Sequence, residues 1–173
     1  RRYQGGLSTG LEELDNLMAI YSRARQFMQE TGNGNQWING YPSREVILAD
    51  IENGYSYVCL DAENEIVATF YFRIGEDPTY ARIDDGKWLN DEPYGVVHRL
   101  AGSGKVKDVG SYCLQWCFEQ IQNIRVDTHH DNVVMQHILK KNGFLPCGII
   151  YVSNGTPRIA FQKIGNKKPV SDI

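Results

Sequence analysis

The side chains best suited to moving a proton at neutral pH lie near the ends of two expected strands. His98 falls in the segment 94–101, and histidine, with an ordinary pKa of about 6.5, suits a general base. Asp127 and His129 close the next expected strand, where they are candidates to act through water or to hold a substrate. A structural histidine with a satisfied hydrogen bond is the alternative interpretation of His98, and both stay open.

The segment from Ile124 to Phe144 places a strand, a helix and a helix stop one after another. Asn132 is suited to cap the helix with its side-chain oxygen, and Gly143 is suited to end it because glycine readily adopts the left-handed conformation. A capped helix followed by a strand explains each residue singly. The whole run, from Asn132 to the Gly-Phe pair at this spacing, resembles the second conserved block of the GNAT family of acetyltransferases.

The segment 96–111 is similar to the cofactor block of that family, in which a strand leads to a helix N-terminus whose backbone N–H groups receive a pyrophosphate. Asp108 replaces the first glycine of the family pattern, and a carboxylate repels a pyrophosphate unless it turns outward. Lys105 and Lys107 would offset part of this repulsion. The resemblance implies the cosubstrate acetyl-coenzyme A (acetyl-CoA), held by Leu100, Ala101, Lys105, Lys107, Val109, Gly110, Ser111 and Asn132.

The resemblance also implies where relatives carry their catalytic acid and base. Many relatives have a Tyr four residues before the glycine of the Gly-Phe pair, which protonates the departing thiolate, whereas this chain has Leu139. Another donor must then serve, or the thiolate leaves unassisted. Relatives often carry a Glu on the strand of the cofactor block, where this chain has Val96 and Val97. His98 is therefore the best remaining candidate for the catalytic base.

Aromatic residues in loops and at element ends are candidates for the walls of an acceptor pocket, because aromatic faces suit an organic or protonated amine. The alternative for Trp37 and Trp88 is that they cover the sheet as core aromatics. The acidic residues of the loop 75–93 either attract a cationic substrate or are merely solvated. The expected substrate-binding residues are Trp37, Tyr41, Trp88, Tyr94, Asp127 and His129.

Composition argues against several other classes of protein. A net charge of −3 shows none of the basic surplus that is typical of nucleic-acid binding. The apolar runs are shorter than the about 20 residues of a membrane-spanning helix, and no signal peptide is apparent at the N-terminus. The four cysteines fit neither a zinc site nor a CxxC pair. We expect free thiols, a cytoplasmic location and no metal.

Hydrophobic periodicity predicts a single mixed α/β (α+β) domain over 1–173, with a core at about 8–164 and a polar tail at 165–173. Thr9 and Glu12 have the spacing of a capping box ahead of an amphipathic helix that ends at about 31. The order of elements predicts a twisted, mostly antiparallel sheet with one parallel crossover and helices on both faces. Further helices are expected at 43–53, 106–123 and 131–142, and strands at 55–60, 65–74, 94–101, 124–128, 145–152 and 158–164.

These patterns together predict an N-acetyltransferase that moves acetyl from acetyl-CoA to a primary amine of a small molecule by direct transfer. Cys113 lies on a buried helical stripe, and no covalent nucleophile is expected. A catalytically degenerate acyl-CoA-binding or regulatory domain, favoured by Asp108 and Leu139, stays open. So does a protein or peptide N-acetyltransferase, which would need an open groove. The amine is the expected partner, neither nucleic acid nor membrane is, and a homodimer is common in the family.

Overall fold

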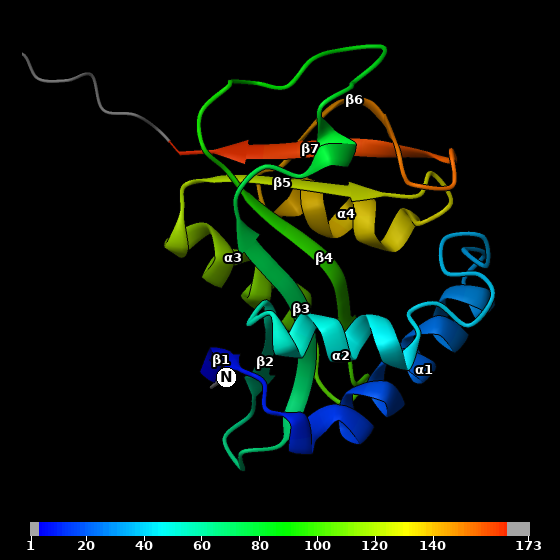
Figure 1. Cartoon of the computed structure of the whole chain (residues 1–173), viewed down its shortest axis with the longest axis vertical. Helices are drawn as coiled ribbons and strands as arrows, with labels where there is room; N and C mark the ends of the chain where they lie inside the picture. Colours follow the sequence, from blue (N-terminus) through cyan, green and yellow to red (C-terminus); the bar gives the residue numbers. More distant parts are fainter. Residues whose placement is uncertain (1–3, 166–173) are drawn as a thin grey trace, which may run out of the picture.

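One twisted sheet of seven strands runs through residues 4–165, the part of the chain that this computed structural model describes (Figure 1). The strand order is β1-β2-β3-β4-β5-β7-β6, and every neighbouring pair is antiparallel except β4 and β5. The expected sheet with one parallel crossover is confirmed. Its strands are β1 (Gln4–Ser8), β2 (Ser56–Leu60), β3 (Ile66–Ile74), β4 (Gly95–Gly102), β5 (Asn123–Thr128), β6 (Leu145–Tyr151) and β7 (Pro157–Ile164).

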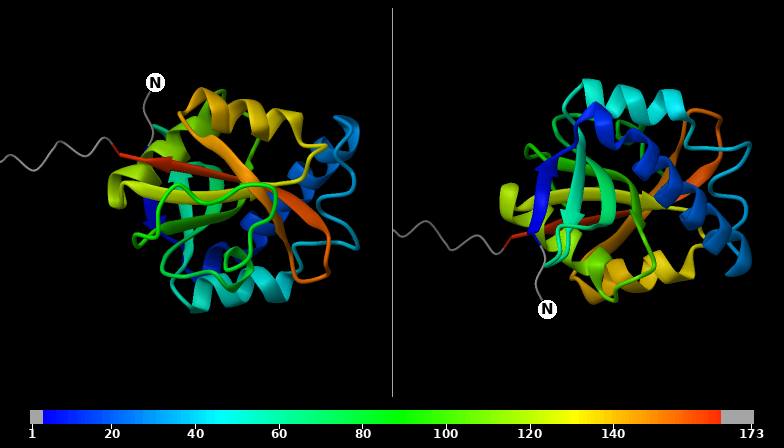
Figure 2. Two further views of the ribbon diagram at one scale, coloured as in Figure 1. Left: turned by 90° about the horizontal axis from the view of Figure 1, so that it is seen from above. Right: turned by 90° about the horizontal axis from the view of Figure 1, so that it is seen from below.

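Helices cover both faces of this sheet, as expected (Figure 2). They are α1 (Leu14–Glu30), α2 (Arg44–Glu52), α3 (Val109–Gln120) and α4 (Val133–Lys141), with short 3-10 helices η1 (Leu11–Glu13) and η2 (Pro78–Tyr80). Leu17 of α1 and Ile47 of α2 belong to one hydrophobic cluster, while Leu114 of α3 and Leu139 of α4 belong to another. The sheet is therefore the middle layer of three.

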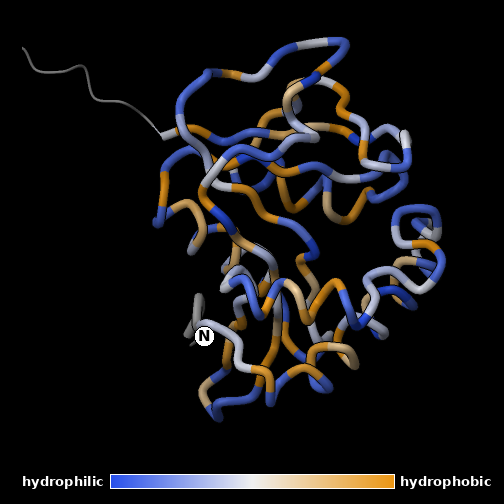
Figure 3. Tube along the Cα trace, in the orientation of Figure 1, coloured by the Kyte–Doolittle hydropathy of each residue, from blue (hydrophilic) through white to orange (hydrophobic). Residues whose placement is uncertain are grey.

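The sequence of β3 shows why two helical layers form. Residues 66–72 read Ile-Val-Ala-Thr-Phe-Tyr-Phe, without the polar alternation of a strand that faces water on one side, and 67–70 are all buried. A continuous apolar run is typical of a strand that is covered on both faces. Hydrophobic colour follows the central strands in Figure 3, whereas the loop between η2 and β4 is largely hydrophilic.

β4 is irregular at Arg99, beyond the point where it stops pairing with β5. Arg99 has a φ of 51°, in the left-handed region, and the register between β3 and β4 shifts between Thr69 and Tyr71. These are the marks of a β-bulge, which bends a strand and increases its twist. β4 and β5 pair at two positions, the second joining Val96 to Arg125, and the two parallel strands part beyond it.

The acidic loop 75–93 packs over one end of the sheet. Tyr80, in η2, is buried beside Tyr94, Ile150 and Ala160. A backbone bridge joins Asp84 to β6. The expected irregular loop is thus confirmed, and its ordered contacts fix it against the strands.

The N-terminal strand and the start of α3 differ from the prediction. β1 pairs with β2 at the edge of the sheet, and its glycine pair has too low a β propensity to indicate a strand. α3 begins at Val109 rather than at 106, because Gly104 and Asp108 adopt positive φ angles of 82° and 62° that interrupt a helix. It ends at Gln120 rather than at 123.

The predicted capping box at Thr9 and Glu12 is wrong. Glu13, one residue later, accepts the backbone N–H of Gly10 at 3.1 Å. Thr9 is buried, and its hydroxyl accepts a hydrogen bond from Ser56 at 3.1 Å. Thr9 therefore ties the chain to β2 instead of capping the helix.

The four cysteines are buried free thiols, as expected: Cys59, Cys113, Cys117 and Cys147. Within residues 4–165, none of the helices has the length and apolar character needed to cross a bilayer. The polar tail was placed at 165–173, of which 166–173 lie outside the described residues.

Candidate active site

Two adjoining chambers lie where β4 and β5 part. One has a volume of about 320 Å³, and we call it the acceptor chamber. The other, of about 480 Å³, lies beside the start of α3, and we call it the cofactor chamber. The two share Met28, Leu100, Asn132 and Met135 in their walls, so they lie side by side. The acceptor chamber is lined by, among others, Gln36, Trp37, Tyr41, Asp77, His98, Arg99, Asp127, Ser153, Asn154 and Arg158.

The cofactor chamber contains most of the residues expected to bind acetyl-CoA. The N-terminus of α3 opens into it, and the first N–H groups of a helix have no acceptor within the helix. Together with the helix dipole, such groups suit a phosphate. Lys105 and Lys107 do not line this chamber. Those expected residues that do line it are Leu100, Ala101, Val109, Gly110, Ser111 and Asn132.

Asp108 is less of an obstacle to an anion than its position suggests. Its carboxylate lies 3.4 Å from the Nζ of Lys141 on α4, which offsets part of the negative charge. Arg23 of α1 adds positive charge from another wall, and its guanidinium fills the space that a side chain at Gly104 would need. Arg23 and Lys141 both line the cofactor chamber. They supply the cations there that were expected from the two loop lysines.

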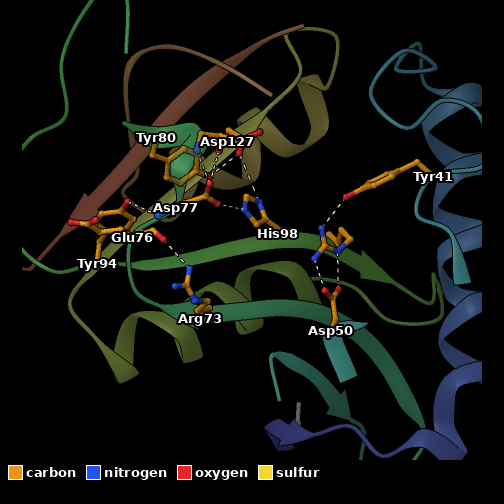
Figure 4. Close-up of polar contacts among 11 residues, drawn as sticks. Tyr41, Asp50, Arg73, Glu76, Asp77, Tyr80, Tyr94, His98 and Asp127 are labelled. Atoms are coloured by element: carbon orange, nitrogen blue, oxygen red, sulfur yellow. Dashed lines mark hydrogen bonds and ion pairs between the residues drawn. The ribbon is translucent and has the colours of Figure 1, made fainter. Parts of the chain in front are cut away.

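His98 lies between two carboxylates in the acceptor chamber (Figure 4). Its Nε2 is 2.7 Å from Oδ2 of Asp77, in the loop before η2, and its Nδ1 is 3.9 Å from Oδ2 of Asp127 on β5. Tyr80 donates its hydroxyl to the same Asp127 oxygen at 2.7 Å. Neither contact of His98 with a carboxylate could be predicted from the sequence, because the three residues come from separate elements that meet where β4 and β5 part.

The protonation of this cluster follows from its contacts. Burial works to raise the pKa of Asp77, but hydrogen bonds from His98 and Thr79 prevail and lower it to about 2. Asp77 is therefore an ionised acceptor for an N–H on Nε2, and Nδ1 is the nitrogen that lies toward Asp127. Burial and the Asp127 carboxylate raise the pKa of Tyr80 well above its ordinary value, so Tyr80 remains a neutral donor.

Trp88 and Tyr94 do not line the cleft. Trp88 donates its indole N–H to the backbone carbonyl of Tyr80 at 2.9 Å. Tyr94 is buried, and its hydroxyl accepts the backbone N–H of Asp77 at 2.9 Å. Both side chains thus support the acidic loop that holds Asp77, which for Trp88 agrees with the alternative of a core aromatic.

Trp37 and Tyr41 do line the acceptor chamber, and Tyr41 is joined to the bulge of β4. Its hydroxyl accepts from Nη1 of Arg99 at 2.8 Å. Nε and Nη2 of Arg99 donate to the two carboxylate oxygens of Asp50 at 2.8 and 2.7 Å. Tyr21 donates its hydroxyl to the Arg99 carbonyl at 2.9 Å. The left-handed residue is therefore held by both α1 and α2.

Gln36 is a positioning residue that no sequence pattern marks. Its side-chain oxygen accepts the hydroxyl of Thr128 at 3.2 Å, the backbone N–H of His129 at 3.3 Å and an amide N–H of Asn132 at 3.0 Å. One carbonyl thereby joins the α1–α2 loop to the end of β5 and the start of α4. It also occupies one N–H of the Asn132 amide that the resemblance assigns to the cofactor.

The segment after β5 caps α4 as expected. Asn132 accepts a backbone N–H of the first helical turn at 2.9 Å. His129 is buried and does not line the cleft, and its pKa is lowered by burial and by Arg158. His129, His130 and Asp131 place potential metal-ligand atoms within 4.8 Å of one another, a group that the sequence did not predict. Nδ1 of His129 already accepts the backbone N–H of Asp131 at 3.0 Å.

The chain is similar to a solved acetyltransferase of the GNAT family from Streptococcus agalactiae 2603, at 34% identity and a TM-score of 0.85, covering 95% of this chain and 96% of that one. A putative phosphinothricin N-acetyltransferase matches at 17% identity and a TM-score of 0.61, covering 96% and 100%. The NatC complex bound to Gag peptide and CoA matches at 10% identity and a TM-score of 0.62, covering 95% of this chain and 98% of that one. Neither family models nor curated protein sequences give a match.

The matches at 10% and 17% identity show the fold alone. The Streptococcus protein adds agreement in sequence over almost the whole length of both chains. This chain is a member of the GNAT family of acetyltransferases.

Proposed function

We propose that this protein transfers the acetyl group of acetyl-CoA to the primary amine of a small molecule by direct attack. The observation that carries the proposal is the junction of the two chambers. Leu100 lines both of them, and His98, two residues earlier on β4, stands in the acceptor chamber. A thioester that enters from the cofactor chamber would arrive next to an imidazole that a carboxylate holds in place.

The residues of the cofactor chamber fit a phosphate-bearing cosubstrate. The N-terminus of α3 offers backbone N–H groups, and Gly110 leaves them accessible because it has no side chain. Arg23 and Lys141 add positive charge. When bound, acetyl-CoA would supply the activated acetyl group as a thioester.

His98 would act as the base for the acceptor amine. The amine nitrogen must be neutral to attack the thioester carbonyl, and Nδ1 of His98 accepts its proton. Asp77 stabilises the imidazolium that forms. As the C–N bond forms, the C–S bond breaks and its electron pair leaves with sulfur. The thiolate takes its proton from water or from His98, because Leu139 is fully buried and has none to give.

The shape of the acceptor chamber supports a small acceptor. The α1–α2 loop closes it with Trp37 and Tyr41, the β6–β7 turn with Ser153 and Asn154, and the acidic loop with Thr79. Its volume of about 320 Å³ is at the lower end of the about 300–1,000 Å³ typical of small-molecule sites. A peptide acceptor would need a groove that continues beyond these walls.

Two observations bear on the alternative of a degenerate acyl-CoA-binding domain. Asp108 and Leu139 depart from the family pattern and favour it. The short contact between Asp77 and His98, at 2.7 Å, favours turnover, because a domain that only binds acyl-CoA has no need of an oriented base.

The four buried free thiols suit a reducing compartment.

The experiment is a calorimetric titration of the purified protein with acetyl-CoA, followed by an assay of thiol release with a panel of small amines and short peptides. Micromolar binding with release of CoA by small amines supports the proposal. Binding without turnover of any amine supports the degenerate domain, and turnover of peptides alone supports the peptide alternative. Absence of binding contradicts all three.

A further inference from the structure

Arg158 is a buried cation in the wall of the acceptor chamber. It lies on β7 with 8% of its surface exposed, and it lines the same chamber as His98 and Asp127. Its Nη1 donates to the Thr156 hydroxyl at 3.0 Å and to the Pro157 carbonyl at 3.1 Å, and its Nη2 donates to the Gln36 carbonyl at 3.3 Å. All of these acceptors are neutral oxygens. Within residues 4–165 no carboxylate forms an ion pair with it.

This isolation is unusual for a buried charge, which is ordinarily paired. Arg99, in the same chamber, shows the ordinary arrangement, because its Nε and Nη2 together hold both oxygens of Asp50. In Arg158 the Nε–H and the second Nη2–H have no acceptor among the described residues. Nε and Nη2 are also the two nitrogens with which Arg99 holds Asp50, and such a pair of neighbouring nitrogens matches a carboxylate in a bidentate way.

Negative charge gathers a short distance away. Asp127 pairs with Ala160 in the β5–β7 register, and Arg158 is two residues before Ala160 on the same face of β7. Asp127 and Arg158 are therefore diagonal neighbours, about 7–8 Å apart between Cα atoms. Asp77, whose carboxylate is ionised, lies beside His98 in the same chamber. The chamber is thus lined by two carboxylates and by a guanidinium that has no carboxylate partner among the described residues.

We propose that the acceptor is an amino acid, whose carboxylate is bound by Arg158 while its amino group lies against Asp127 and His98. This inference rests on the proposed N-acetyltransferase function and names its substrate class. A simple amine would leave the guanidinium without a charged partner, whereas the carboxylate of an amino acid neutralises it. The protonated amino group enters on the acidic side, where His98 can take its proton.

The test compares each common L-amino acid with its α-carboxamide, which has the same side chain and amine but no negative charge. Wild-type protein is expected to acetylate the best amino acid with a kcat/KM about 10- to 100-fold above that of its carboxamide, since hydrogen bonds to a charged group are of that size. Arg158→Gln lowers kcat/KM for the amino acid by a similar factor, and it lowers kcat/KM for the carboxamide by a much smaller one. Arg158→Lys restores part of the loss. Arg82 is an exposed arginine outside the chamber, so Arg82→Gln is the control that alters kcat/KM for neither the amino acid nor its carboxamide.

Two results would overturn the proposal. Equal kcat/KM for acids and carboxamides in the wild-type protein would remove the carboxylate site, and this comparison stands even where Arg158→Gln does not fold. An equal loss for both substrates in a folded Arg158→Gln protein would make Arg158 a structural residue. Either result leaves turnover of amines intact and so spares the proposed function. Acetyl-CoA binding without acetylation of any amine would refute both together.

Discussion

At the scale of single residues, His98 is defined by its two carboxylate neighbours. Asp77 holds Nε2 at 2.7 Å, and Asp127, itself bound by Tyr80, lies 3.9 Å from Nδ1. A histidine that only fills space needs one satisfied hydrogen bond, whereas the two nitrogens of this one face two carboxylates in the wall of the acceptor chamber. The arrangement favours the base over the structural alternative, and the role of His98 stays a prediction until it is measured.

The first prediction concerns catalysis by His98. Replacing it by Ala is expected to lower kcat by about 10²-fold or more, because the amine then loses its proton acceptor. The limb of the pH–rate profile that reports the base should disappear. Steady-state kinetics across neutral pH provide the measurement, with the affinity for acetyl-CoA as the unchanged control. A variant with the wild-type profile would remove His98 from the mechanism.

The second prediction concerns acid stability. The pKa of Asp77 is lowered in the folded protein from 3.8 to about 2, so its carboxylate stabilises the fold above about pH 4 and loses that contribution as the pH falls toward 2. The free energy of unfolding of wild-type protein should therefore exceed that of Asp77→Asn at about pH 5, and the gap should narrow as the pH falls.

Urea unfolding at several pH values measures this gap. Asp15→Asn is the matched control, because the carboxylate of Asp15 is exposed and its pair with Arg44 lies at the surface. A gap between wild type and Asp77→Asn that stays constant down to about pH 2.5 would show that Asp77 carries no such linkage.

At the scale of elements, the site depends on two local departures from regular structure. The bulge at Arg99 follows the point where β4 stops pairing with β5, and the left-handed Asp108 is the N-cap residue of α3. Arg99 lines the acceptor chamber, and Asp108 lines the cofactor chamber together with the first residues of α3.

The third prediction tests the N-terminus of α3. Gly110→Asp is expected to weaken acetyl-CoA binding by about tenfold or more, because a carboxylate would stand among the N–H groups that receive phosphate. Gly110→Ala is the matched control. Its Cβ would lie 3.7 Å from the nearest neighbouring atom, on Ile138, and therefore fits. Calorimetry measures the affinity of both variants for acetyl-CoA. Equal affinities of Gly110→Asp and Gly110→Ala would contradict the assigned phosphate site.

At the scale of the whole molecule, a buried ion pair joins a helical layer to the sheet. The side chains of Asp50, on α2, and Arg99, on β4, are 10% and 13% exposed. Nη2 of Arg99 lies 2.7 Å from Oδ1 of Asp50. Tyr41 extends the contact to the α1–α2 loop. The pair therefore couples global stability to the shape of the cleft.

The fourth prediction follows from this coupling. Asp50→Ala is expected to lower the free energy of unfolding by about 3 kcal/mol, because it leaves the Arg99 guanidinium buried without a counter-charge. Asp15→Ala breaks the surface pair with Arg44 instead and should cost less than about 1 kcal/mol. Denaturant unfolding of both variants gives the comparison. Equal losses would mean that the buried pair is no more important than a surface one.

Local sequence was sufficient for much of this molecule. Apolar periodicity and stop signals predicted α2, α4 and the strands from β2 to β7, because these elements are determined by neighbours close in the chain. The spacing from Asn132 to Gly143 was sufficient to indicate the family. Homodimer formation stays a prediction.

Tertiary structure alone decided which side chains share the cleft. The partners of His98 are 21 and 29 residues away from it, and Gln36 reaches Asn132 across 96 residues, so no local pattern reports them. The isolation of Arg158 depends on burial against elements far along the chain. The sequence by itself determined the elements and the family through short-range patterns, whereas the site arose from long-range packing, which fixes distance, burial and charge pairing.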